Sequence, residues 1–234
     1  KAEGGWGVVN TEYCSIHPSS DDVPYPYASL WDQSDVRAHH MMTKKLHKHN
    51  AVAGVQLWYG GANASSQYTR EIPIDVNSRP NADGLPYQSR KMDKQDFRNL
   101  RQWFKDAALR AKEAEFDIVY AYATHHYLLH NFQLSDINDR NDEYGGSVKN
   151  RSRLLREIIK VLKDAVGDKM AVAVRFSPDD NKLINNKPVT DEGKEFFELV
   201  AELPDLWDVT SSNWDIELGT SRFVNEGANE PYID

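Results

Sequence analysis

Residues 116–132 read FDIVYAYATHHYLLHNF, and this stretch joins an apolar strand to an unusual concentration of polar rings. Its first half, Phe116–Ala123, is rich in aromatic and β-branched residues, which predicts a buried strand. The strand runs into five polar rings within nine positions: Tyr122, His125, His126, Tyr127 and His130. Buried imidazoles and phenols need hydrogen-bond partners, which a core strand does not offer and a site at the end of the strand would use; the rest of the chain decides between core and site.

The same order, an apolar strand followed by a segment of helical period, recurs along the whole chain. Five strands are predicted, at Val8–Ile16, Ala51–Tyr59, Phe116–Ala123, Met170–Phe176 and Leu206–Thr210. Four helices are predicted between them, at Ser34–His49, after an N-cap at Asp93, at Val148–Val166, and from an N-cap at Thr190 to Pro204. Strict alternation of this kind is typical of α/β proteins with a parallel sheet.

The ends of the predicted strands favour a barrel over a dinucleotide-binding fold. No GxGxxG motif follows the first strand, so a Rossmann domain has no support. In a (β/α)8 TIM barrel the active-site residues lie at the carboxyl ends of the strands. Every predicted strand ends in residues able to bind a ring or do chemistry, among them Tyr13, Trp58, Tyr122, Arg175 and Trp214. A partial TIM barrel is therefore predicted.

Composition narrows the class of protein. The chain has 234 residues, of which 40% are hydrophobic, and a formal net charge of −8 with scattered basic residues, which argues against a nucleic-acid partner. The mean hydropathy is −0.68, and no apolar run reaches the roughly 18 residues of a membrane span. The single cysteine, Cys14, is expected to be a small buried residue, excludes an internal disulfide and indicates a cytoplasmic protein. We expect the chain to be a fragment of a longer protein.

Four residues within the predicted strands or at their ends are candidates for chemistry. Tyr122 and His125 are three positions apart and could polarise or deprotonate a ligand, or could merely bond loop backbone. Gln56 and Arg175 lie in strand interiors by pattern. A buried guanidinium needs an anion or a polarised carbonyl, which a flavin ring, a carboxylate or an internal ion pair would supply.

Three aromatic residues at three strand ends suggest a site for a cation. Converging rings at Tyr13, Trp58 and Trp214 could bind an alkylammonium ion, at roughly 0.5–2 kcal/mol per ring. Ordinary packing at a barrel mouth is the alternative. His126 and His130 have no spacing that demands a metal. The other histidines considered are expected to be solvated, namely His17, His39, His40, His47 and His49.

Residues Asn138–Arg153, NDRNDEYGGSVKNRSR, resemble the signature loop and helix of the old yellow enzyme family. Further resemblance runs through KAEGGWGVVNTEYCSI, AGVQLWYGGA, FDIVYAYATHHYL and LWDVTSSNWDIELGTSRF, and is to the branch of trimethylamine, dimethylamine and histamine dehydrogenases. Ene-reductases of the family usually have a histidine where Tyr122 stands, so the tyrosine favours the amine branch.

The resemblance implies a cofactor and a set of site residues. FMN would be contacted by Gln56 and Arg175. The catalytic triad of the branch would correspond to Tyr122, His125 and Glu217, and its substrate pocket to Tyr13, Tyr27, Trp58 and Trp214. Three positions depart from the trimethylamine enzymes: Glu217 replaces an aspartate, Tyr27 a small hydroxyl residue, and Gln56 a glutamate.

The resemblance also implies which part of the enzyme this chain represents. Residues 1–234 would form a single FMN-binding TIM-barrel domain, truncated at both ends and spanning about strands 2 to 6. The cysteine that attaches FMN, the ligands of a [4Fe–4S] cluster and the C-terminal domains would lie outside it. The full-length protein would be a homo-oligomer.

The resulting hypothesis is FMN-dependent N-demethylation of a small alkylamine, with trimethylamine as the first candidate, giving formaldehyde and the smaller amine. Electrons would pass to an electron-transfer flavoprotein. Two alternatives stay open: an NAD(P)H-dependent ene-reductase of the dienoyl-CoA reductase type, and an inactive barrel that only senses a quaternary ammonium compound. Neither a nucleic acid nor a membrane is expected as a partner.

Overall fold

A single parallel sheet organises the protein. The computed structural model describes residues 1–21, 28–65, 67–81, 86–178 and 190–210. Five strands form the sheet in the order β1-β2-β5-β6-β7, and every neighbouring pair is parallel. Their bounds are Val8–Ser15 (β1), Val52–Trp58 (β2), Ile118–Ala123 (β5), Ala171–Phe176 (β6) and Leu206–Val209 (β7). The predicted strands are confirmed to within two residues at each end.

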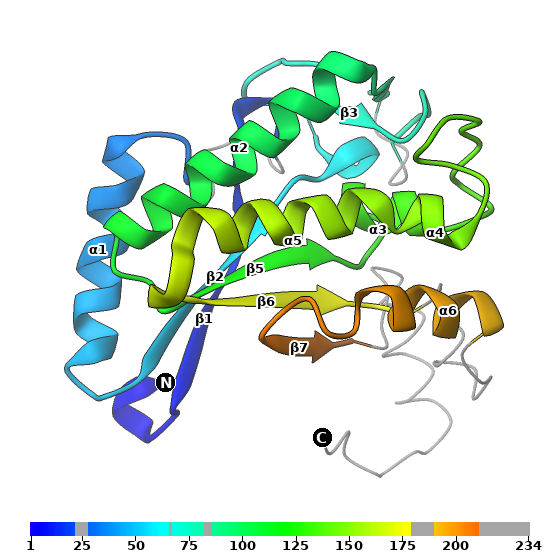
Figure 1. Ribbon diagram of the computed structural model, residues 1–234. Coiled ribbons are helices and arrows are strands. Elements are labelled where there is room, and N and C mark those ends of the chain that lie inside the picture. Colours follow the sequence, from blue (N-terminus) through cyan, green and yellow to red (C-terminus); the bar gives the residue numbers. More distant parts are fainter. Residues whose placement is uncertain (22–27, 66, 82–85, 179–189, 211–234) are drawn as a thin grey trace, which may run out of the picture.

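Four crossover helices cover one face of this sheet (Figure 1). They are α1 (Gln33–His47), α2 (Lys94–Glu113), α5 (Arg153–Val166) and α6 (Asp191–Val200). The predicted N-caps are confirmed, because Asp93 accepts hydrogen bonds from the amides of Gln95 and Asp96, and Thr190 accepts one from Gly193. The strand–helix alternation is that of a TIM-barrel segment.

The expectation of one helix over Val148–Val166 is wrong. The structure has a short α4 (Val148–Arg151) and then α5, separated at Ser152. The Ser152 hydroxyl donates to the carbonyl of Lys149, a local bond that competes with regular helix geometry. The predicted end of the following helix at Pro204 is also late, since α6 ends at Val200.

Short elements fill segments that the sequence predicted only as loops. The stretch between β2 and α2 contains a two-stranded parallel sheet, β3 (Ile74–Asp75) and β4 (Arg90–Lys91). The ring-rich stretch after β5 forms helix α3 (Leu128–Gln133). Single 3₁₀ turns occur at Ala2–Gly4, Pro18–Ser20, Gly61–Asn63 and Gly167–Lys169. Among the described residues, no helix is long and apolar enough to cross a membrane.

The two faces of the sheet differ in chemistry. Alternate residues of β2, β5 and β6, such as Val55, Val119 and Val172, are buried in the main core with the helices. The intervening residues point to the opposite face, where Tyr122, Arg175 and Asp208 are aligned across three neighbouring strands. Strands buried on both faces normally read as continuous apolar runs, so this row of polar residues marks the functional face.

A buried carboxylate fixes the long segment between β2 and α2. Asp75 is fully buried and accepts hydrogen bonds from the amides of Ala62 and Val76, at 2.7 and 2.6 Å. Its carboxylate also accepts from Nε of Arg79 at 3.2 Å and from the side-chain amide of Asn131 at 3.0 Å. Burial raises the pKa of Asp75, and the Arg79 cation opposes that rise. The carboxylate thus joins the β2–α2 segment to α3.

We expect Asp75→Ala to destabilise the intact protein by about 3–5 kcal/mol, because it leaves the half-buried Arg79 and two backbone amides without their acceptor. Urea unfolding measures the change in the free energy of unfolding. The exposed Glu195 provides the matched control, and Glu195→Ala should leave stability nearly unchanged. Equal stability of the two variants would contradict the role given to Asp75.

The expectation that five histidines are solvated is wrong for His17 and holds only in part for His39, His40 and His47. His17 is half-buried and stacks on Trp103 with ring centroids 3.8 Å apart. His39, His40 and His47 are also half-buried, and His47 pairs with Asp117 at 2.9 Å. Only His49 of this group is exposed. Burial lowers the pKa of His17 from 6.5 to about 4.

His17 should therefore make the fold sensitive to acid. Its pKa is lower in the folded protein than in the unfolded chain, so the unfolded chain takes up the proton first and stability falls between pH 6.5 and pH 4. His17→Phe keeps a ring on Trp103 but cannot titrate, and should lose less stability over this interval. Urea unfolding at both pH values tests this against His49→Phe, which should behave like the wild type.

Candidate functional site

Aromatic residues from three strands meet at the carboxyl edge of the sheet. Tyr13 on β1 lies 4.9 Å from Trp58 on β2 and 6.5 Å from Tyr122 on β5, measured between ring centroids. The strands are parallel and adjacent, so residues far apart in sequence reach the same edge. The structure therefore brings together three of the residues that the sequence predicted.

Tyr127 is a fourth member, which the sequence analysis noted among the rings after the strand but to which it gave no role. Its ring is perpendicular to that of Trp58 at 5.1 Å and lies 5.4 Å from that of Tyr122. We call Tyr13, Trp58, Tyr122 and Tyr127 the aromatic cluster. The position of Tyr127 among the rings that follow β5 could have marked it as a site residue. The direction of its side chain, however, depends on the turn that precedes α3.

Tyr122 and His125 form a buried hydrogen-bonded pair. The phenolic oxygen of Tyr122 lies 3.0 Å from Nδ1 of His125. Burial raises the pKa of Tyr122 above its ordinary value of 10, and the nearby cation of Arg175 partly opposes the rise. The phenol consequently stays protonated near neutral pH and can donate to Nδ1.

The turn that presents His125 is conformationally costly. His125 and His126 have φ angles of 58° and 55°, in the left-handed region that non-glycine residues rarely occupy. Such residues cost of order 1–3 kcal/mol each and often occur at functional sites. Two in succession indicate that surrounding contacts hold the turn in place.

Arg175 joins the aromatic cluster to a carboxylate. It forms an ion pair with Asp208 at 2.5 Å, and its guanidinium carbon lies 5.9 Å from the ring centroid of Tyr122. The internal ion pair left open by the sequence is therefore present. Nevertheless Nε of Arg175 is buried and has no hydrogen-bond partner among the described residues.

These donors fit the polar edge of a flavin. An isoalloxazine ring presents carbonyl oxygens and an imide N–H side by side, which a guanidinium and a carboxamide can bind together. Gln56 supplies a buried amide one strand away from Tyr122, and Arg175 supplies its unsatisfied N–H. The residues present thus suit FMN.

Some predicted residues cannot be placed. Tyr27, Trp214 and Glu217 lie outside the described residues. Within the described part of the chain, no three histidine, cysteine or acidic side chains gather as metal ligands. Cys14 is buried, as expected.

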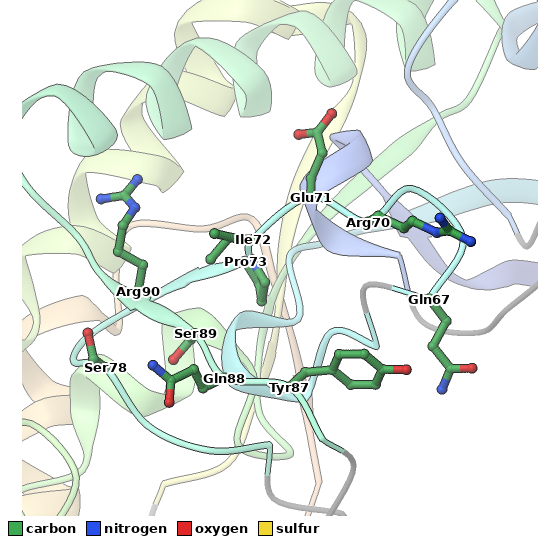
Figure 2. Close-up of a pocket in the computed structure, with 10 residues that line it drawn as sticks. All are labelled: Gln67, Arg70, Glu71, Ile72, Pro73, Ser78, Tyr87, Gln88, Ser89 and Arg90. Carbon is green, nitrogen blue, oxygen red and sulfur yellow. The ribbon is translucent and has the colours of Figure 1, made fainter.

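A separate hollow of about 740 Å³ lies in the segment between β2 and α2. Figure 2 shows Ile72 and Pro73 at its centre, between Arg70 and Arg90. None of the predicted site residues that the structure describes lines it, and neither does any member of the aromatic cluster.

Comparison with known proteins agrees with the resemblance seen in the sequence. Residues 1–230 match the model of the NADH:flavin oxidoreductase / NADH oxidase family. The chain belongs to this family.

Three relatives are proteins that act on amines. Dimethylamine dehydrogenase from Hyphomicrobium sp. (strain x) is 38% identical over 95% of this chain and 32% of its own length. Histamine dehydrogenase from Rhizobium sp. 4-9 has a TM-score of 0.84 and 40% identity over 92% of this chain. The 6-hydroxypseudooxynicotine amine oxidase of Pseudomonas geniculata N1 has a TM-score of 0.86 and 42% identity over 91%. The chain covers 32% of each of these two structures, about a third of the relatives' length.

We expect Arg175→Met to raise the pKa of Tyr122 further, because it removes the cation that favours the phenolate. The ultraviolet absorbance of phenolate, followed against pH in Arg175→Met with and without Tyr122→Phe, isolates this tyrosine. The exposed Arg156 provides a control, and Arg156→Met should leave the titration unchanged. A lower pKa in Arg175→Met would contradict the assigned electrostatics.

Proposed function

We propose that this chain is the FMN-binding part of a flavin-dependent amine dehydrogenase. The observation that carries the proposal is the aromatic cluster beside the Tyr122–His125 pair. Family membership supports a flavin, and the activities of three relatives support an amine as substrate.

The aromatic cluster suits an alkylammonium ion. The faces of aromatic rings attract cations without supplying the polar partners that a carbonyl substrate would require. Tyr13 is half-buried while Trp58 and Tyr127 are buried, so Tyr13 forms the accessible side of the cluster. A tertiary amine presents methyl groups to these rings, and we propose trimethylamine as the first substrate to test.

The Tyr122–His125 pair would control the proton of the substrate. An amine must lose its ammonium proton before its lone pair can assist oxidation. The raised pKa of Tyr122 keeps the phenol protonated, so the phenol would take the ammonium proton as it passes its own proton to Nδ1 of His125. Glu217 would complete the triad.

FMN, when bound, would supply the two-electron oxidation at the carbon next to nitrogen. The residues of this chain would orient it, with Gln56 and Arg175 on its polar edge. Water would then hydrolyse the oxidised amine to formaldehyde and the smaller amine. We further propose a cytoplasmic homo-oligomer that passes electrons to an electron-transfer flavoprotein, with any [4Fe–4S] ligands outside this chain.

The experiment that tests the proposal is anaerobic reduction of the flavin in the intact protein by trimethylamine, dimethylamine, histamine and NADPH. Rapid loss of flavin absorbance with one amine, and none with NADPH, is expected. Reduction by NADPH with all amines inert would overturn the proposal and favour an ene-reductase. A flavin-free protein that still binds amines would favour a sensor.

Tyr13→Leu should raise the KM for the amine by about 2- to 30-fold, which corresponds to one cation–π contact of about 0.5–2 kcal/mol. The matched control is Tyr13→Phe, which keeps the ring and should change KM much less. Steady-state kinetics with the reactive amine measures both. An equal effect of the two substitutions would assign the role to the hydroxyl instead.

A further inference from the structure

We propose that His130 is a positioning residue that holds His125 in the site by accepting the backbone N–H of His126. The inference concerns the turn between β5 and α3, and its consequence for the reaction depends on the proposed function. Nδ1 of His130 lies 3.1 Å from the amide nitrogen of His126.

Both ends of this turn are fixed by the fold. Upstream, Ala123 closes β5 in the centre of the sheet. Downstream, α3 begins where the amide of Leu128 donates to the carbonyl of Tyr59 at 3.2 Å, and Asn131 is bonded to the buried Asp75. The chain must therefore cross from strand to helix in four residues, 124–127.

The crossing uses the two left-handed residues. The amide of Tyr127 donates to the carbonyl of Thr124 at 3.2 Å, which closes the turn around His125 and His126. With a φ of 55° at His126, its N–H meets the His130 ring on the first turn of α3. The hydrogen bond from the His126 amide to His130 offsets part of the conformational cost of the positive φ at His126.

His130 is suited to this role because it is rigid. It is 2% exposed, lies on an entirely buried helix, and its ring is perpendicular to that of His126 at 5.4 Å. Acceptance by Nδ1 requires that this nitrogen carry no proton, which fixes one tautomer of the neutral ring. The side chain of His130 thus accepts the amide N–H of His126, four positions earlier, and thereby fixes the backbone next to His125.

The functional consequence is the geometry of the Tyr122–His125 pair. If His126 left the left-handed region, the peptide plane between His125 and His126 would rotate and carry the imidazole away from the phenol. The 3.0 Å contact between Tyr122 and His125 is therefore the feature that His130 protects. Tyr13, Trp58 and Tyr122, which lie on the strands, would stay in place.

Substitutions at His130 distinguish the effect of its hydrogen-bond acceptor from the effect of its side-chain volume. His130→Asn places an amide oxygen where Nδ1 lies, whereas His130→Gln places its oxygen farther out and His130→Leu has none. We expect kcat for the amine to fall at least about tenfold in His130→Gln and His130→Leu, with KM little changed. His130→Asn should recover most of the wild-type kcat.

A second substitution tests the mechanism through the backbone. Glycine adopts positive φ at little cost, so His126→Gly should restore much of kcat when combined with His130→Leu. The two substitutions should then be strongly non-additive in a double-mutant cycle. Additive losses would overturn the proposal, as would equal activity of His130→Asn and His130→Gln.

A readout independent of activity separates this proposal from the proposed function. Hydrogen exchange at the His126 amide, measured by mass spectrometry in the intact protein, should accelerate in His130→Gln and return towards the wild-type rate in His130→Asn. Unchanged exchange in His130→Gln would overturn the positioning role. Failure of every amine to reduce the flavin would overturn the proposed function alone, because the exchange result would still decide the role of His130.

Discussion

The buried carboxylate of Asp75 is the constraint on which the geometry of the site depends. A charge fully removed from water is tolerated only where enough donors surround it, and Asp75 collects two backbone amides, Arg79 and Asn131. Through Asn131 it fixes α3, and α3 carries His130, whose ring holds the turn before it. A residue with no place in the chemistry thus determines where His125 lies.

The motif that carries the family resemblance also serves the fold. In the motif Asn138–Arg153, the buried guanidinium of Arg140 donates to the carbonyls of Val76 and Met92, each at 3.0 Å, and lies 5.0 Å from the ring centroid of Phe97. Arg151 similarly donates to the carbonyl of Gln133 at the end of α3. These arginines replace water as donors to buried carbonyls. The motif therefore serves the fold, although it contributes no residue to the aromatic cluster.

The sequence predicted the parts that depend on local pattern. Apolar runs and helical periods placed the five strands and four crossover helices, and the cap residues Asp93 and Thr190 marked two helix starts. Prediction failed where tertiary contacts decide. The break at Ser152 and the two-residue strands β3 and β4 carry no periodic signal, and the burial of His17 against Trp103 joins residues from separate elements.

The sequence by itself determined the α/β class, the family, and the identity of Tyr13, Trp58, Tyr122, His125 and Arg175 as candidates, because strand ends in a parallel sheet reach one edge whatever the details of packing. Only the tertiary structure decided how these residues meet. It added Tyr127, paired Arg175 with Asp208, and set Tyr122 against His125. Those contacts depend on strand register and on a turn with two left-handed residues. The register is set by pairing between strands distant in sequence, and α3 after the turn is fixed by long-range bonds to Tyr59 and Asp75, which no local pattern encodes.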